Sequence, residues 1–443
     1  MFRNFPKQPN LIVFVFLASI LFVSCGTSKQ PASSMAAEPA NSSDSLSLQD
    51  RIEIFEDVWK TINEQYYDAT FHGVNWQEVH GRYRPRVEAA KTDVEFYRLF
   101  EEMLAVLRDA HTVFNHPQSN AGNINPPGSV GISLGEVEGK TASTAVELNS
   151  DAARAGVKPG MILRTVNSRP AEEIFAEIRS QFAGSSTERA MKGVLHGAIL
   201  YGGFLGASRT FGIEGFDGKL FNVPIIHFGT GPSESPTLTA RRLPSGIGYI
   251  KFDGWKPPVD EQFRTELRKL MDTPGLVVDL RGNGGGQTDV LLNISSIFFP
   301  KAVSFGGFKK RGGTVEEIFT YKSDQTYQGA IVILVDEASA SASEVFTASM
   351  QENARARIIG RQTCGCVLNQ ASKKEKGGGT LRWSARVYSS PEGRVLEGTG
   401  VIPEETVAPT LSDLRRGRDA ALEAAQNFLT RKDANNRVTH IIF

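Results

Sequence analysis

The sequence has no excess of charge of either sign and contains few cysteines. Its 443 residues include 49 basic and 49 acidic side chains, so the formal net charge is zero. A balanced charge gives no sign of the basic surface that nucleic-acid binding requires, so no nucleic-acid partner is expected. Of the three cysteines, Cys364 and Cys366 have no nearby Cys or His to complete a metal ligand set, so no metal site is expected. A hydrophobic content of 40% supports a normal globular core, and the length favours two or three domains.

The apolar stretch near the N-terminus is too short to cross a bilayer comfortably, which indicates a targeting signal. Residues 11–23 are predominantly apolar, basic residues precede them, and Cys25 follows closely, as in a bacterial lipoprotein signal. The pattern predicts a signal peptide over residues 1–25 with a lipidated Cys25; the alternative is an ordinary secretory signal cut nearby. Residues 26–46 have the composition of a flexible tether. We therefore expect a lipid-anchored protein of the bacterial cell envelope, in the periplasm or on the outer surface.

The segment 47–120 is predicted to be a helical region. Apolar residues recur at helical spacing over residues 52–66, and a second apolar stripe runs over residues 96–107. Residues 92–95 carry a capping-box signature at the start of the second stripe. His111 stands one turn beyond this stripe, where a histidine can also serve as a simple partner of the helix dipole.

Residues 128–230 resemble a PDZ domain. Residues 129–134 are similar to the loop and strand that bind a peptide's C-terminus, and residues 150–163 match the later helix–turn–strand signature. Such a module adds a ligand strand to a sheet edge and captures the carboxylate with backbone N–H groups. The resemblance implies a peptide-binding site at Val130, Gly131 and Ile132.

Residues 235–408 alternate strand and helix patterns, as in an α/β domain with right-handed crossovers. The strands are expected at residues 247–252, 276–280, 331–335, 356–359 and 382–387. Residues 409–443 follow as a C-terminal segment, with one closing helix over residues 411–430 that packs on this core. The whole chain is therefore predicted to be an α+β multidomain protein.

Three serines lie at the corner between a buried strand and the next helix. Ser339, Ser341 and Ser343 follow the apolar residues 330–335 and precede a predicted helix over residues 344–353. The free N–H groups at a helix N-terminus favour developing negative charge, and nucleophile elbows use this geometry. The alternative interpretation is that the serines simply cap the helix.

A glycine run follows another buried strand. Residues 281–286 contain four glycines after the strand-like residues 275–280, and their N–H groups are suited to an oxyanion hole. Neither the dinucleotide spacing nor the P-loop spacing is met, so the run is not a phosphate-binding fingerprint.

Together these segments resemble the C-terminal processing peptidases, or tail-specific proteases, a serine protease family that includes the tricorn core protease. The motifs that carry the resemblance are residues 279–286, 339–344, 397–404 and, for the tricorn-like branch, 107–112. The resemblance implies a crotonase-like α/β protease core without metal or organic cofactor. It also implies Ser341 as the nucleophile, with the N–H groups of Ala342 and Gly285 as the oxyanion hole.

The identity of the general base separates two branches of the family. The tail-specific branch uses a lysine four residues before a glutamine, but here Cys366 occupies that position before Gln370. The tricorn-like branch uses a histidine oriented by a glutamate, and its motifs match His111 and Glu397. Imidazole has a pKa near the operating pH, so it can take the serine proton and return it to the leaving amine. The resemblance therefore implies a Ser341–His111–Glu397 site. The alternatives are His116 for the histidine and Glu344 or a surface role for the glutamate.

The family resemblance implies protein or peptide substrates with accessible C-termini. Three other hypotheses stay open, and the first of them is motivated by Cys366 at the lysine position. In the first, the chain is an inactive peptide-binding or scaffold protein. In the second, it is an enzyme whose base is displaced to Lys373 or Lys374. In the third, it is an enzyme whose active site is gated by the PDZ-like domain. The pair Cys364 and Cys366 is suited to a disulfide or a redox switch, but two free thiols that pack in the loop are the simplest interpretation.

Overall fold

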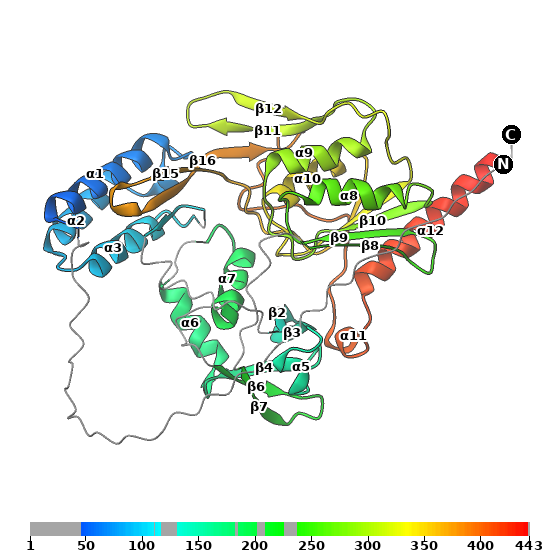
Figure 1. Cartoon of the computed structure of the whole chain (residues 1–443), viewed down its shortest axis with the longest axis horizontal. Coiled ribbons are helices and arrows are strands. Elements are labelled where there is room, and N and C mark those ends of the chain that lie inside the picture. Colours follow the sequence, from blue (N-terminus) through cyan, green and yellow to red (C-terminus); the bar gives the residue numbers. More distant parts are fainter. Residues whose placement is uncertain are drawn as a thin grey trace, which may run out of the picture. The chain divides into compact units, whose positions relative to one another are not determined.

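The structure of the chain is a computed structural model that describes residues 46–109, 111–116, 131–181, 185–201, 209–225 and 237–441. Within these ranges, helices accompany three β-sheets (Figure 1), and the predicted α+β class is confirmed. The predictions for the signal peptide, the tether, Cys25 and Val130 lie outside the described residues. In the described part of the chain, no helix is both long and apolar enough to cross a membrane.

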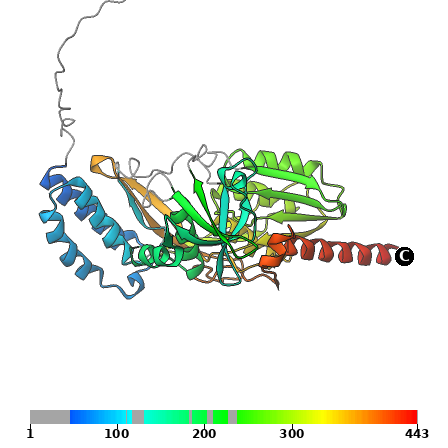
Figure 2. The ribbon, with the colours of Figure 1, turned by 90° about the horizontal axis from the view of Figure 1, so that it is seen from below.

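The N-terminal region consists of three helices and a short 3₁₀ turn. These elements are α1 (Leu48–Gln65), η1 (Phe71–Gly73), α2 (Trp76–Ala89) and α3 (Asp93–Ala105). The helices, blue in Figure 2, lie side by side. Each begins at a polar cap, and the Ser47 Oγ, for example, accepts the Asp50 N–H at 3.1 Å. Their apolar faces form a core that also includes Phe114, Leu381 and Trp383 from two strands of the first sheet.

The first sheet ties this helical region to the C-terminal half of the chain. Its strands are β1 (Val113–Asn115), β11 (Ser304–Lys310), β12 (Val315–Phe319), β15 (Asn369–Lys374) and β16 (Thr380–Ser389). The long strand β16 pairs antiparallel with β1, β11 and β15, and Phe114 lies opposite Leu381 in this ladder. The Phe114 ring stacks on Phe100 of α3 at 4.5 Å between ring centroids. The segment that carries His111 is therefore fixed against β16.

The second sheet is the centre of the protease-like half. Its order is β17 (Glu405–Thr406), β14 (Arg357–Gly360), β13 (Ala330–Val335), β10 (Gly275–Asp279), β9 (Gly248–Phe252) and β8 (Leu238–Arg242). The strands from β17 to β9 run parallel, and β8 is an antiparallel edge strand. Parallel strands are buried on both faces, which explains the continuous apolar runs in the sequence.

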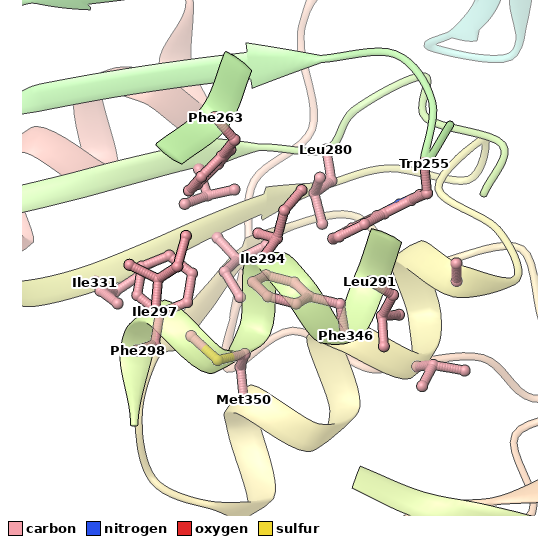
Figure 3. Close-up of a cluster of buried hydrophobic side chains, with 14 of the residues drawn as sticks. Trp255, Phe263, Leu280, Leu291, Ile294, Ile297, Phe298, Ile331, Phe346 and Met350 are labelled. Carbon is pink, nitrogen blue, oxygen red and sulfur yellow. The ribbon is translucent and has the colours of Figure 1, made fainter. Parts of the chain in front are cut away.

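Helices cover one face of this sheet. Helices α8 (Val259–Arg268), α9 (Thr288–Ser295) and α10 (Ala342–Glu352) and the 3₁₀ turn η3 (Ser296–Phe298) contribute to the cluster drawn in Figure 3. Trp255 packs edge-on against Phe252 and lies 5.2 Å from the Phe346 ring of α10, centroid to centroid. Each fully buried side chain of this kind contributes about 1.5–3 kcal/mol. The cluster thereby fixes α10, whose first residue follows Ser341.

The opposite face is covered by the C-terminal helix α12 (Ala420–Ile441), which packs on Val277, Val332 and Leu334. The prediction of one helix over residues 411–430 is wrong. The structure has a short helix α11 (Leu411–Arg415), then a break at Gly417, and then α12. Gly417 has φ = 66°, a left-handed conformation that ends a helix and suits glycine.

The third sheet is formed by residues 132–225, which include most of the segment that resembles a PDZ domain. Its order is β2 (Ile132–Val137), β3 (Lys140–Val146), β4 (Ile162–Val166), β6 (Arg209–Glu214) and β7 (Leu220–Ile225), and β5 (Arg169–Pro170) pairs with β4. Helices α5 (Asp151–Arg154), α6 (Ala171–Gln181) and α7 (Glu188–Tyr201) accompany it. A separate apolar core joins this sheet to its helices. The PDZ-like assignment stays a prediction. A last 3₁₀ turn, η4 (Lys376–Gly378), lies between β15 and β16.

Candidate active site

Ser341 occupies a sharp corner between β13 and α10. Its backbone has φ = 54° and ψ = −117°, which a non-glycine residue adopts only under strain. The Ser341 N–H donates to the carbonyl of Cys366 at 3.0 Å and to the Glu344 carboxylate at 3.1 Å. This geometry is that of a nucleophile elbow, in which a strained turn presents the hydroxyl at a helix N-terminus.

The two neighbouring serines have different roles, and their interpretation as helix caps is wrong. The Ser339 Oγ accepts the Asp336 N–H at 3.0 Å and donates to the carbonyl of Leu280 at 2.8 Å. The Ser343 Oγ donates to the carbonyl of Asn283 at 2.9 Å. Both serines are fully buried and join the elbow to the glycine run, so neither presents a hydroxyl for attack.

Glu344 is buried beneath the elbow and organises its backbone. Its carboxylate accepts the Gly365 N–H at 2.7 Å, the Cys366 N–H at 2.9 Å, the Ser341 N–H and the Thr363 hydroxyl. Burial raises the pKa of Glu344, and these four donors oppose that effect. The four donors favour the ionised carboxylate, whereas burial favours the protonated form.

A cavity of about 230 Å³ connects the elbow to the N-terminal region. Both Ser341 and His111 line it, although they lie far apart in the sequence. The other lining residues are neutral: Gly286, Thr288, Leu291, Phe308, Ala342, Val345, Val367, Leu368, Asn369 and Gln370. His111 is thus the residue on this cavity with a side chain suited to general-base catalysis.

His111 is held by residues on both sides of it in sequence and by the site loop. It lies in the turn before β1 and not on α3, which ends at Ala105. Its N–H donates to Asp109 Oδ1 at 2.8 Å, and its Nδ1 lies 3.7 Å from the same oxygen. The Thr112 hydroxyl donates to Asp109 Oδ2 at 2.6 Å, and the Gln370 amide donates to the His111 carbonyl at 2.6 Å. Burial lowers the pKa of His111 and the Asp109 charge opposes this, so the imidazole is neutral at pH 7.

Glu397 lies beside the site loop, but among the described residues no hydrogen bond joins it to His111. Its Oε2 accepts the Val367 N–H at 2.7 Å. Burial, together with the nearby negative charges of Asp109 and Glu344, raises the pKa of Glu397 to about 7. The carboxylate nearest to the imidazole is therefore Asp109, which the family resemblance did not assign.

The backbone N–H groups near Ser341 differ in what they contact. The Gly285 N–H, which was expected in the oxyanion hole, donates to Asn283 Oδ1 at 3.0 Å. Gly286 and Ala342 line the cavity, and no hydrogen bond joins either N–H to another described residue. A Cβ on Gly285 would lie 2.7 Å from the Ser341 Cβ, so this glycine allows the backbone to pack closely against Ser341.

The alternative bases lie elsewhere. Lys373 pairs with Asp57 of α1, and neither Lys373 nor Lys374 is among the residues that line the cavity. His116 stacks on the Tyr97 ring at 4.7 Å between centroids and is also absent from the cavity lining. Within the described ranges, no cluster of three or more His, Cys, Asp or Glu is suited to a metal ion.

Cys364 and Cys366 form a disulfide, with an S–S distance of 2.06 Å. The interpretation of these cysteines as two free thiols is therefore wrong. Both are buried, and the Cys366 carbonyl is the acceptor for the Ser341 N–H. The bridge thus lies directly against the elbow, in the loop where the tail-specific branch carries its lysine.

Two residues of the segment before and within α7 contact the site loops, and sequence reasoning missed both. The Thr187 hydroxyl donates to the Cys364 carbonyl at 2.7 Å. The Arg189 guanidinium donates to the carbonyls of Thr363 and Thr399, each at 2.7 Å. All three acceptors are backbone carbonyls, which leave no residue-type signal in the sequence, so no motif pointed to these contacts.

Comparison with known proteins agrees with this geometry. Residues 246–407, which contain the elbow, the glycine run and the disulfide loop, match the profile "Peptidase family S41". This part of the chain belongs to peptidase family S41. It is therefore a serine-type peptidase, and the predicted resemblance is confirmed. Residues 48–105 match the profile "Tricorn protease C1 domain", and this match ends before the motif of residues 107–112.

Relatives align over nearly the whole chain. The carboxyl-terminal-processing protease of Synechocystis is 23% identical over 409 residues, which cover 88% of this chain and 89% of that protein. The chloroplastic carboxyl-terminal-processing peptidase 2 of Arabidopsis thaliana is 26% identical over 419 residues, covering 90% and 75%. Among solved structures, mature CPAF has a TM-score of 0.64 at 13% identity, with coverages of 87% and 96%. The photosystem II D1 C-terminal processing protease has a TM-score of 0.58 at 20% identity, with coverages of 84% and 98%. These two structures support the fold.

Proposed function

We propose that this S41 peptidase is an extracytoplasmic endopeptidase of the tail-specific type, anchored through a lipidated Cys25 and using a histidine base. Its substrates are proteins or peptides with an accessible C-terminus, held at Val130, Gly131 and Ile132. The observation that carries the proposal is that Ser341 and His111 line one cavity, and that no lysine is among the described residues that line it. The names of the relatives, which are carboxyl-terminal-processing proteases, support the substrate class.

The chemistry is acyl transfer. The neutral His111 imidazole accepts the Ser341 hydroxyl proton as the oxygen attacks the scissile carbonyl, and it returns that proton to the leaving amine. The N–H groups of Ala342 and Gly286 stabilise the oxyanion, because both line the cavity beside Ser341 and neither donates to another described residue. Asp109 stabilises the imidazolium that forms, since its Oδ1 lies 3.7 Å from Nδ1. Glu397 supports the loop through Val367.

A fluorophosphonate probe tests the proposal on the full-length chain in detergent. We expect labelling at Ser341, located by mass spectrometry, and its loss in Ser341→Ala and His111→Ala. His116→Ala is the matched histidine control and should label like wild type. The double variant Lys373→Ala, Lys374→Ala should also label normally, and loss of labelling there would favour a lysine base.

The second candidate function is peptide binding without turnover. It is favoured by one observation, that Cys366 stands where the tail-specific branch carries its base. If wild type takes no label, even with hydrophobic C-terminal peptides present, while those peptides still bind, this scaffold function replaces the proposed one.

A further inference from the structure

We infer that the Cys364–Cys366 disulfide is a positioning element of the active site, which holds the backbone that carries the nucleophile. Reduction of the bridge should lower turnover and leave substrate binding nearly unchanged. The part of this inference that concerns turnover rests on the proposed function. The part that concerns the backbone does not, and it can be measured separately.

Both cysteines of the bridge are hydrogen-bonded to the elbow. Cys366 contributes its carbonyl to the Ser341 N–H at 3.0 Å, so one half of the disulfide is bonded directly to the nucleophile. The other half, Cys364, donates its N–H to the Ser339 carbonyl at 3.0 Å. The two residues that the S–S bond joins thus hold the elbow at Ser339 and at Ser341. Val367, the next residue, lines the cavity.

Further hydrogen bonds depend on the conformation of the bridged loop. The Gly365 and Cys366 N–H groups both donate to the buried Glu344 carboxylate, and the Gly365 carbonyl accepts the Gly398 N–H at 3.0 Å. Gly365 has φ = 75°, and a glycine loses more conformational freedom on ordering than other residues. The bridge spans this glycine and restricts it to the conformation in which all of these bonds form together.

The ring that the Cys364–Cys366 disulfide closes is small. Entropic stabilisation by a disulfide grows with the length of the loop it closes, and here the bonded residues are separated by two positions. Such a small ring contributes little to global stability, so its effect is local. Oxidising compartments preserve disulfides, which agrees with the proposed extracytoplasmic location.

The expected effect on catalysis follows from the placement of Ser341. A displacement of about 1 Å at a reacting group costs about 100-fold in rate. We therefore expect reduction to lower kcat by about 10- to 100-fold while KM changes by less than about threefold. A water-soluble trialkylphosphine is the reductant. It supplies two electrons that break the S–S bond, each sulfur takes up a proton, and the phosphine gains the oxygen of one water molecule to become the phosphine oxide.

The experiment compares oxidised, reduced and reoxidised wild type with the double variant Cys364→Ala, Cys366→Ala. The tryptic peptide 362–373 contains both cysteines, so its mass reports the redox state, since the reduced form carries two more hydrogens. We expect the variant to match reduced wild type in kcat and KM and to unfold at nearly the wild-type temperature. Addition of the phosphine should not change its kcat or KM. Reoxidation should restore kcat. Unchanged kcat in protein whose peptide is shown to be reduced would overturn the inference, as would a peptide that is reduced in the protein purified without reductant.

Amide hydrogen exchange separates this inference from the proposed function. Reduction should accelerate exchange in peptides that cover residues 339–345 and 362–367, whereas α8 should exchange as before. If wild type has no turnover in either state but these segments still loosen on reduction, the proposed function fails and the positioning of the backbone stands. If exchange in these segments is the same in both states, the positioning inference is wrong, whatever the activity.

Discussion

Replacement of Glu397 by glutamine should make the protein more stable at alkaline pH. Glu397 is enclosed beside the site loop, and burial raises its pKa from 4.5 to about 7. Unfolded Glu397 releases its proton near its ordinary value, whereas folded Glu397 keeps its proton until about pH 7. The stability contributed by this group is therefore complete below about pH 4.5 and is lost as the pH rises through about 7.

The magnitude follows from the size of the shift. At about 1.4 kcal/mol per unit of pKa, ionisation of Glu397 in the folded protein costs about 3 kcal/mol. Glutamine resembles the protonated carboxyl, and its amide oxygen can still accept the Val367 N–H. Glu397→Gln should therefore exceed the wild-type free energy of unfolding by less than about 1 kcal/mol at about pH 5 and by about 3 kcal/mol at about pH 8.

Urea unfolding followed by tryptophan fluorescence between about pH 5 and 8 measures this difference. Glu392→Gln is the matched control, because Glu392 is an exposed glutamate of the same segment and its replacement should add no pH dependence. A difference between Glu397→Gln and wild type that stays constant across this range would refute the reasoning that burial holds Glu397 in its protonated form.

Three further predictions concern the groups around the elbow. Asp109→Asn should slow fluorophosphonate labelling of Ser341 by about 100-fold or more, because it removes the charge nearest to the His111 imidazole. Glu397→Gln should slow the same labelling by less than about tenfold. If Glu397→Gln had the larger effect, Glu397 and not Asp109 would be the carboxylate that orients the imidazole. Glu344→Gln should lower the free energy of unfolding by about 2–6 kcal/mol, because the amide nitrogen takes the place of a carboxylate oxygen that accepts two buried hydrogen bonds. A loss below about 1 kcal/mol in urea unfolding would contradict this prediction. The acid limb of the pH profile of kcat/KM should have its midpoint below pH 6.5, since burial lowers the pKa of His111 and only the neutral imidazole accepts a proton. A midpoint near pH 7 would instead indicate that Glu397 must be ionised for activity.

The elbow and the core strands were predictable from the sequence because local pattern determines them. An apolar run bounded by glycines or serines forms a parallel strand, and the strand-to-helix corner at Ser341 follows directly from that order. The helix break at Gly417 was missed, because an apolar stripe on either side of a glycine has the same period as an uninterrupted helix.

The partners of the candidate site were less predictable, since they depend on backbone geometry and on distant contacts. Asp109 faces the His111 ring after a turn in which Arg108 has φ = 50°, and residue spacing alone does not report such a turn. Glu344 was considered only as an alternative to Glu397, yet it accepts four hydrogen bonds from the elbow and the disulfide loop. Arg189 contacts carbonyls that lie far away in sequence, and a carbonyl carries no residue identity.

The pairing of β1 with β16 has a consequence for the biosynthesis of this enzyme. His111 precedes β1 near the start of the folded part, whereas Ser341 and β16 are synthesised much later. During synthesis from the N-terminus, His111 is therefore made before the chain contains Ser341 or β16. The two groups meet only when β16 has emerged and closed the ladder. Under the proposed mechanism, the nucleophile and the base are thus paired only in a chain that has been synthesised at least as far as β16.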